Sequence, residues 1–391
     1  MSSRSRLLIF IVSTPLVILA AVGGLMGASS ARAPQQSMAH LRVFEDVTSL
    51  VTSAYVEPVD VDRVMDGAMR GLTDALDPSS AYLSAEEVRA VESPAPPPAG
   101  EIGVVLTRQF YLRVVGVRDG SPAARAGLRT GDFIRGIDGK PTREISAFAG
   151  NRLLRGTPGS KIQLTVLRGN AAEPRVMDLV REAPKGDLVT SKRLPGGEGY
   201  VRVVSFATGA AAAIRKQIDA VRQAGATSAV IDVRGIADGT IEEGIAAARH
   251  FVKTGTLATR AGRTATDRTA TTAASADGGV TMPLVLLVSN GTANAAELFA
   301  SALASNGRAD LVGEPTAGIA AVQHLVKLPE SRGLWLTYAR YLDKDGKAIH
   351  ERGLAPTVAV EEPTFGFEET PPATDDMLAK AIERLKIRKA A

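Results

Sequence analysis

Two short segments carry most of the candidate chemistry of this chain. Residues 289–297 read Ser-Asn-Gly-Thr-Ala-Asn-Ala-Ala-Glu, and residues 313–323 read Gly-Glu-Pro-Thr-Ala-Gly-Ile-Ala-Ala-Val-Gln. The apolar run 284–288 predicts a strand that leads into the first segment, and a helix is expected to follow it. Acyl transfer in such a setting would need a nucleophile, a base that takes its proton and donors for the oxyanion.

Both segments resemble the active site of the C-terminal processing peptidases, also called tail-specific proteases, which use a serine nucleophile and a lysine base. In that family the segments read N-G-x-x-S-A-S-E and G-E-x-T-x-G-K-G-x-x-Q. With the shared residues aligned, Asn294 stands at the serine position and Ile319 at the lysine position. The resemblance further implies that Gln323 is the orienting glutamine, which is present here without a lysine to orient.

These two replacements remove the chemistry of the family. Ile319 cannot accept a proton, and the amide nitrogen of Asn294 is a poor nucleophile because its lone pair is delocalised into the carbonyl. Loss of a nucleophile or a base alone costs about a millionfold in rate. We predict instead that Asn294 caps the following helix, with its side chain accepting from the amide of Glu297 and the Glu297 carboxylate reaching back.

A third segment, the turn that holds the oxyanion donor in the family, also differs from the family's sequence. The family reads D-L-R-N-N-P-G-G at the turn that presents a backbone amide to the oxyanion, whereas residues 232–239 read Asp-Val-Arg-Gly-Ile-Ala-Asp-Gly. Asp238 therefore replaces the first glycine and Gly239 keeps the second. A carboxylate there would repel an oxyanion, and a residue with a side chain does not readily adopt glycine backbone angles. Loss of one oxyanion donor costs on the order of a hundred- to a thousandfold.

The favoured hypothesis is therefore an inactive family member, a pseudopeptidase. The alternative is an active enzyme with a rewired catalytic pair. Ser289 and Thr292 lie on the approach to the helix, and Ser301 lies about two turns inside it. Lys327 follows Gln323 on the same expected strand, where alternation of side chains lets the two share a face. Under this alternative the protein is an active serine-type endopeptidase that trims C-terminal tails.

Residues 99–170 resemble a PDZ domain. A glycine-punctuated loop leads into a strand, and the phrases at 120–128, 131–139 and 154–166 follow in the family's order. The resemblance implies capture of protein C-termini, because successive backbone N–H groups bind a carboxylate and the strand edge accepts a peptide strand. We expect the helix near residues 144–154 to form the second wall. The simpler alternative is a tight hairpin entry. The expected peptide-binding residues are Gly100, Ile102, Gly103, Val104, Val105, Leu106 and Phe148.

The rest of the chain predicts an α/β multidomain protein. Strands that alternate with helices predict a largely parallel sheet with both faces covered, and the resemblance implies a core of the ClpP/crotonase-like type. Residues 254–280 are expected to be exposed and irregular. The predicted organisation is a helical N-terminal segment at 41–92, a proline-rich linker at 93–100, a peptidase-like core at 186–362 and a tail with a helix at 363–391.

The N-terminus predicts export. Arg4 and Arg6 precede an apolar run at 7–26 and an Ala-Arg-Ala sequence, which is typical of a secretory signal peptide. Residues 1–33 are alternatively a single membrane anchor, since the run is about long enough to cross a bilayer. Either places the chain in the periplasm or cell envelope.

Composition limits the partners. The absence of cysteine excludes disulfides and thiol nucleophiles, and four scattered histidines predict neither a metal site nor a cofactor. A net charge of +4 without a basic run predicts no nucleic-acid partner. The expected partners are C-terminal tails of exported proteins, and the oligomeric state is left open.

Overall fold

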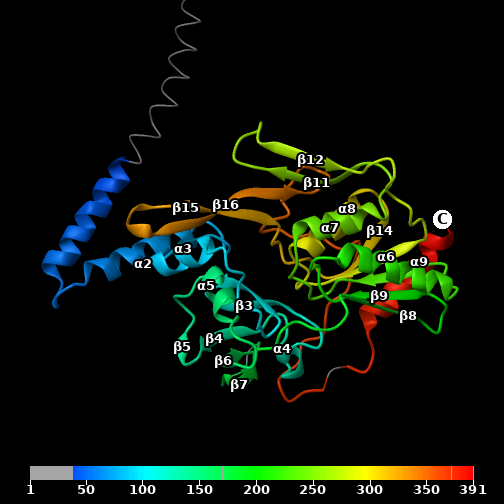
Figure 1. Cartoon of the computed structure of the whole chain (residues 1–391), viewed down its shortest axis with the longest axis horizontal. Helices are drawn as coiled ribbons and strands as arrows, with labels where there is room; N and C mark the ends of the chain where they lie inside the picture. Colours follow the sequence, from blue (N-terminus) through cyan, green and yellow to red (C-terminus); the bar gives the residue numbers. More distant parts are fainter. Residues whose placement is uncertain (1–37, 170, 172, 371, 391) are drawn as a thin grey trace, which may run out of the picture. The chain divides into compact units, whose positions relative to one another are not determined.

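The computed structural model describes residues 38–390 apart from 170, 172 and 371 (Figure 1). Contacts divide the chain into two units, one up to Met69 and one from Arg70 onward. Residues 38–54 are helical, and α2 (Val61–Asp74) follows a break that contains Pro58. The predicted signal or anchor segment, residues 1–33, lies outside the described residues. Across the part of the chain that the structure describes, no helix combines the length and apolar character needed to span a membrane.

An antiparallel sheet with two short helices occupies the region that resembles a PDZ domain. The strand order is β2-β3-β4-β6-β7, with β5 paired to β4. Alternate residues of β6 point into the core, where Ile162, Leu164 and Val166 are buried. The elements are β2 (Val104–Gln109), β3 (Tyr111–Val117), α4 (Pro122–Arg125), β4 (Phe133–Ile137), β5 (Lys140–Pro141), α5 (Ala147–Leu153), β6 (Lys161–Leu167) and β7 (Arg175–Val180).

A second, six-stranded sheet forms the α/β core, in the order β17-β14-β13-β10-β9-β8. All its pairs are parallel except β8 with β9, which matches the prediction of a largely parallel sheet. The strands are β8 (Val189–Arg193), β9 (Gly199–Val203), β10 (Ala229–Asp232), β13 (Leu284–Val288), β14 (Ala309–Gly313) and β17 (Val358–Ala359), and the helices are α6 (Ala210–Gln223), α7 (Ile241–Arg249), α8 (Ala295–Ser305) and α9 (Asp376–Ala390).

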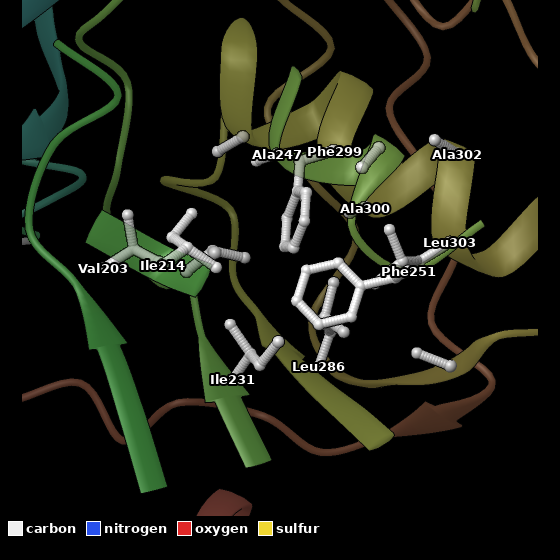
Figure 2. Packing of buried hydrophobic residues seen from close by; sticks show 14 of the residues in the cluster. Val203, Ile214, Ile231, Ala247, Phe251, Leu286, Phe299, Ala300, Ala302 and Leu303 are labelled. Carbon is white, nitrogen blue, oxygen red and sulfur yellow. The ribbon is translucent and has the colours of Figure 1, made fainter. Parts of the chain in front are cut away.

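Helices cover both faces of this sheet. On one face Phe251 and Phe299 pack against Ile231 and Leu286, as Figure 2 shows. On the other face α9 packs with Met377, Ala381 and Leu385 against alternate residues of the same strands. Because β13 is buried on both sides, all five of its residues are apolar.

The third sheet corrects one prediction. Residues 254–280 were expected to be irregular, but they contain β11 (Thr256–Ala261) and β12 (Arg268–Thr272), which pair as an antiparallel hairpin. This hairpin is attached to β16 through β11. Such long-range pairing orders a segment whose small residues give little hydrophobic signal. The other elements are β1 (Ala81–Leu83), α3 (Ala85–Glu92), β15 (Ala321–Lys327), η1 (Pro329–Ser331) and β16 (Gly333–Leu342).

The parallel pairing determines where the candidate site lies. Strands β10, β13 and β14 are neighbours, and they lead into residues 233–240, 289–294 and 314–320 respectively. Carboxyl ends of adjacent parallel strands meet at one edge of the sheet. The three segments singled out in the sequence therefore come together there.

Candidate functional site

Backbone hydrogen bonds join the three segments at residues 293, 294 and 317. The amide of Asn294 donates to the carbonyl of Ile319 at 3.0 Å, so the two replaced positions lie next to each other. The amide of Ala293 donates to the carbonyl of Ile236 at 2.9 Å, and the amide of Ala317 donates to the carbonyl of Thr292 at 2.9 Å. The arrangement implied by the resemblance is thus assembled, and we call it the Asn294–Ile319 site.

A fully buried carboxylate, that of Glu297, holds this site together. It accepts from the Thr316 hydroxyl, from the Gly318 amide at 2.7 Å and from the Ile319 amide at 2.8 Å. Burial raises the pKa of Glu297 to about 7, although the hydroxyl and the backbone amides, including that of Asn294, act in the opposite direction. Glu297 therefore ties the first turn of α8 to the loop that carries residue 319.

The predicted helix cap at Asn294 is wrong. Asn294 stands at the N-cap of α8, but its side chain makes no capping hydrogen bond, and its amide nitrogen instead points to the carbonyl of Gly239 at 3.4 Å. The physical reason is the backbone: φ is 53° and ψ is −120°, whereas a capping side chain needs an extended backbone. A non-glycine residue in this region is strained by about 1–3 kcal/mol. Nucleophiles on sharp strand-to-helix turns adopt a strained backbone of this kind.

Ile319 is half-buried and packs against a cluster of the apolar residues Ala293, Ala237 and Val115. Gln323 lies on β15, and its side chain is bonded to Thr337 rather than to residue 319. Its side-chain amide donates to the hydroxyl of Thr337 on β16 at 3.1 Å. Gln323 is therefore part of a polar contact between two strands.

The turn after β10 does not force glycine-like backbone angles on Asp238, contrary to the prediction from the sequence. The left-handed backbone falls on Gly239, with φ of 101°, and Asp238 is outside that region. A Cβ at Gly239 would lie 2.2 Å from the carbonyl carbon of Phe206, so glycine is needed there. The backbone thus accommodates Asp238 without strain.

The Asp238 carboxylate is close to a positive charge. Burial raises the pKa of Asp238, while a hydrogen bond from Ser205 and the nearby guanidinium of Arg118 lower it. Arg118 lies 3.7 Å from Asp238 and also pairs with Glu101. A carboxyl group is thus held at the turn where the family presents a backbone donor.

The residues of the rewired alternative have other partners. Ser289 is buried and its hydroxyl oxygen accepts from the amides of Gly235 and Gly291, at 3.1 and 3.2 Å. The hydroxyl of Thr292 donates to the carbonyl of Val233 at 2.9 Å. Ser301 is buried within α8.

Lys327 lies at the end of β15 and forms an ion pair with Glu92 of α3. Its side chain is 66% exposed to solvent. A lysine base would have to be desolvated enough to lose its proton. In this structure Lys327 does not meet that requirement.

The expected carboxylate loop contains both paired and unpaired backbone groups. The backbone of Gly100 pairs with that of Gly156 at 2.9 Å, and the side chain of Ile102 is buried in the core of the sheet. Gly103 has φ of 78°, and a Cβ there would lie 2.3 Å from that of Ser121. Among the hydrogen bonds of the described residues, the amides of Ile102 and Gly103 have no acceptor.

The helix expected to form the second wall of the groove is α5 (Ala147–Leu153), and it packs against β2, but Phe148 is not its contact residue. Val104 and Val105 lie half-buried on β2, and Leu106 is buried. Asn151 of α5, rather than Phe148, contacts the backbone of β2 through Leu106. The Phe148 ring lies 5.3 Å from that of Trp335 on β16, outside the PDZ sheet. Asparagine is disfavoured inside helices, which is the one sequence signal that could have identified residue 151.

We predict that Glu297→Gln destabilises the protein by about 2 kcal/mol or more, because the new amide group opposes one of the donors around it. The folded-state pKa of Glu297 is raised to about 7 from 4.5. Its contribution to stability is therefore complete below pH 4.5 and is lost as pH rises through 7. Denaturant unfolding at several pH values should show this loss in the wild type and a smaller one in Glu297→Gln.

Glu243→Gln is the control, because the Glu243 carboxylate also accepts from two backbone amides, those of Gly209 and Ala211, but is only partly buried. Equal pH dependence of the free energy of unfolding in wild type and Glu297→Gln would contradict the raised pKa.

Comparisons with known proteins agree with this geometry. Residues 197–360 match the model of peptidase family S41, and residues 113–168 match that of a PDZ domain. The chain is 29% identical over 334 residues to the carboxy-terminal-processing protease of Bartonella bacilliformis, covering 84% of this chain and 77% of that protein. It is 30% identical over 335 residues to the carboxyl-terminal-processing protease of Picosynechococcus sp., covering 82% and 78%.

A solved structure extends the similarity to the fold. The photosystem II D1 C-terminal processing protease matches with a TM-score of 0.67 and 26% identity, over 82% of this chain and 88% of that one. The predicted combination of a PDZ domain with an α/β peptidase core is confirmed. On these grounds the chain belongs to the C-terminal processing proteases of peptidase family S41.

Proposed function

We propose that this protein is a pseudopeptidase, an exported family member that binds protein C-termini and does not cleave them. The observation that carries the proposal is the identity of the two residues joined at the site. Asn294 and Ile319 are linked by a 3.0 Å backbone hydrogen bond, and neither side chain can form a nucleophile or act as a base.

The surroundings of Ile319 support the proposal. Its neighbours Ala293, Ala237 and Val115 are buried and apolar, so the cluster is suited to a hydrocarbon side chain. A lysine at this position would exchange those contacts for a partly desolvated ammonium group. The Asp238 carboxyl group, although paired with Arg118 at 3.7 Å, stands at the turn where the family presents a backbone donor and supplies no donor itself.

We predict that the purified protein does not cleave an unstructured, tail-bearing substrate. Asn294→Ser with Ile319→Lys restores both side chains, yet Asp238 still opposes the oxyanion, so we expect little activity from the double variant. Adding Asp238→Gly should give more. Lower stability is expected in both variants because the lysine is partly desolvated at this half-buried position.

The measurement is substrate cleavage followed by mass spectrometry, with Asn294→Ala and Ser289→Ala as parallel variants. Cleavage by the wild type that either substitution abolishes would overturn the pseudopeptidase proposal and favour an active serine-type endopeptidase.

Tail binding is proposed on the geometry of the carboxylate loop. The amides of Ile102 and Gly103 follow one another and lack acceptors among the described residues, which is the arrangement that binds an anion. Strand β2 begins immediately afterwards at Val104. A peptide whose carboxylate reached these amides would therefore lie along the edge of β2.

We expect peptides with a free C-terminal carboxylate and apolar side chains to bind at micromolar concentration, which corresponds to about −8 kcal/mol. Fluorescence anisotropy with a labelled peptide measures the affinity. The matched control is the same peptide with an amidated C-terminus, which removes the negative charge. Equal binding of both peptides would contradict carboxylate capture.

Export is proposed from the N-terminal sequence, in which Arg4 and Arg6 precede an apolar run. We expect a reporter fused after residue 40 to be accessible to protease outside the cytoplasmic membrane. A companion fusion with Arg4 and Arg6 replaced by glutamate tests the contribution of the basic start. A wild-type fusion that stays protease-protected in the cytoplasm would rule export out.

A further inference from the structure

The edge of β2 that faces α5 already has a hydrogen-bonding partner. The amide of Leu106 donates to Oδ1 of Asn151 at 2.9 Å, and Nδ2 of Asn151 donates to the carbonyl of Leu106 at 2.9 Å. Two residues on adjacent antiparallel strands exchange the same pair of bonds. We call these two bonds the Asn151 bridge, and they give Leu106 what an added peptide strand would give it.

The hydrogen bonds of the Asn151 side chain are complete. Besides the bridge, Nδ2 donates to the carbonyl of Ala147 at 2.8 Å, within the same helix. The side-chain amide has two N–H donors, and these two acceptors use both. Rotation of Asn151 out of the bridge therefore breaks bonds that only water or a ligand can replace.

Close packing holds α5 within reach of β2. Gly150 faces the core of the sheet, and a Cβ there would lie 2.4 Å from a methyl carbon of Leu112. The absence of a side chain at Gly150 thus lets the helix approach the sheet. Arg108 of β2 adds a second connection, because its guanidinium donates to the carbonyls of Arg143 and Ile145, at 3.0 and 3.3 Å.

We propose that Asn151 closes the strand-binding edge of this PDZ domain and must leave it before a C-terminal tail can add to β2. The inference rests on the proposed tail binding and specifies how that site is controlled. The amides of Ile102 and Gly103 have no acceptor among the described residues, whereas the strand edge at Leu106 is occupied by the chain itself. For a tail to bind along the whole strand edge, its backbone must replace the Asn151 side chain as the partner of Leu106.

The exchange lowers affinity. The ligand replaces the two bonds of the bridge one for one, while Asn151 must be rehydrated and its contact with Ala147 is disturbed. Removal of Asn151 should strengthen tail binding on the order of tenfold, the effect of one or two net hydrogen bonds. The gain should be confined to the strand edge and leave the need for a free carboxylate unchanged.

The test compares wild type, Asn151→Ala and Asn151→Asp as purified full-length proteins, by anisotropy with a labelled apolar peptide that ends in a free carboxylate. A carboxylate in place of the Asn151 amide keeps an acceptor for the Leu106 amide but cannot donate to the Leu106 carbonyl, so we expect Asn151→Asp to bind with intermediate affinity. Asn306→Ala is the matched control. Asn306 also bonds a carbonyl of its own helix and that of Thr256, but it lies in the peptidase core.

Hydrogen exchange at the Leu106 amide provides a second readout that does not depend on the peptide. Exchange should be faster in Asn151→Ala than in wild type, and bound peptide should slow it in both proteins. Thermal unfolding of each variant shows whether the PDZ domain remains folded, and Asn151→Asp serves if the alanine variant does not fold.

Three results are distinguishable. Tighter binding by the Asn151 variants, with faster exchange at Leu106, supports the inference. Equal affinity in wild type and both variants overturns it and leaves tail binding intact. If no protein binds the peptide, tail binding itself is wrong, and the proposed control by Asn151 falls with it.

Discussion

The buried carboxylate of Glu297 is the interaction on which the site depends. It joins the first turn of α8 to the loop after β14 by accepting from Thr316, Gly318 and Ile319. The position of residues 294 and 319 relative to each other therefore depends on a third residue, not on their own side chains. The fold around these two positions therefore does not rely on the side chains that occupy them.

The surrounding backbone also imposes the strain at Asn294. The residue is held at φ of 53° by the hydrogen bond from its amide to Ile319 and by the turn between β13 and α8. Strain of this kind persists only where the surrounding structure over-determines it. Asparagine tolerates positive φ better than most residues, so Asn294 fits the backbone of this turn. The geometry of the turn and the chemistry of its side chain are thus separable.

The sequence predicted the site because its spacing is local and its strands are continuous apolar runs. The run 284–288 could only be a buried strand or a short helical piece, and its position before a turn and a helix decided between them. The capping box failed because the pattern Asn-x-x-Glu is compatible with several backbone angles at Asn294, and only the extended one permits the cap. The predicted backbone strain at Asp238 was wrong for a similar reason, because it depended on which residue of the turn has a positive φ.

Other features depend on contacts remote in sequence. The hairpin at 256–272 is ordered by pairing with β16, about eighty residues later in the chain. Its Thr- and Ala-rich sequence shows no hydrophobic periodicity. Phe148 lies on a helix of seven residues, too short for periodicity to define which side faces the sheet. Its aromatic side chain indicated a pocket, but Trp335 of another sheet provides its partner.

Asn151 combines two physical demands in one side chain. An unpaired strand edge exposes backbone donors and acceptors that invite pairing with unrelated chains, and a binding groove needs that same edge to be accessible. A side-chain amide satisfies both groups of Leu106 at 2.9 Å, yet it leaves by rotation of side-chain torsions rather than by movement of a strand. A leucine or valine at this position would leave the backbone amide and carbonyl of Leu106 without a partner or bonded only to water. The polar residue inside α5 is therefore explained by the backbone that it faces, and its helix propensity is secondary.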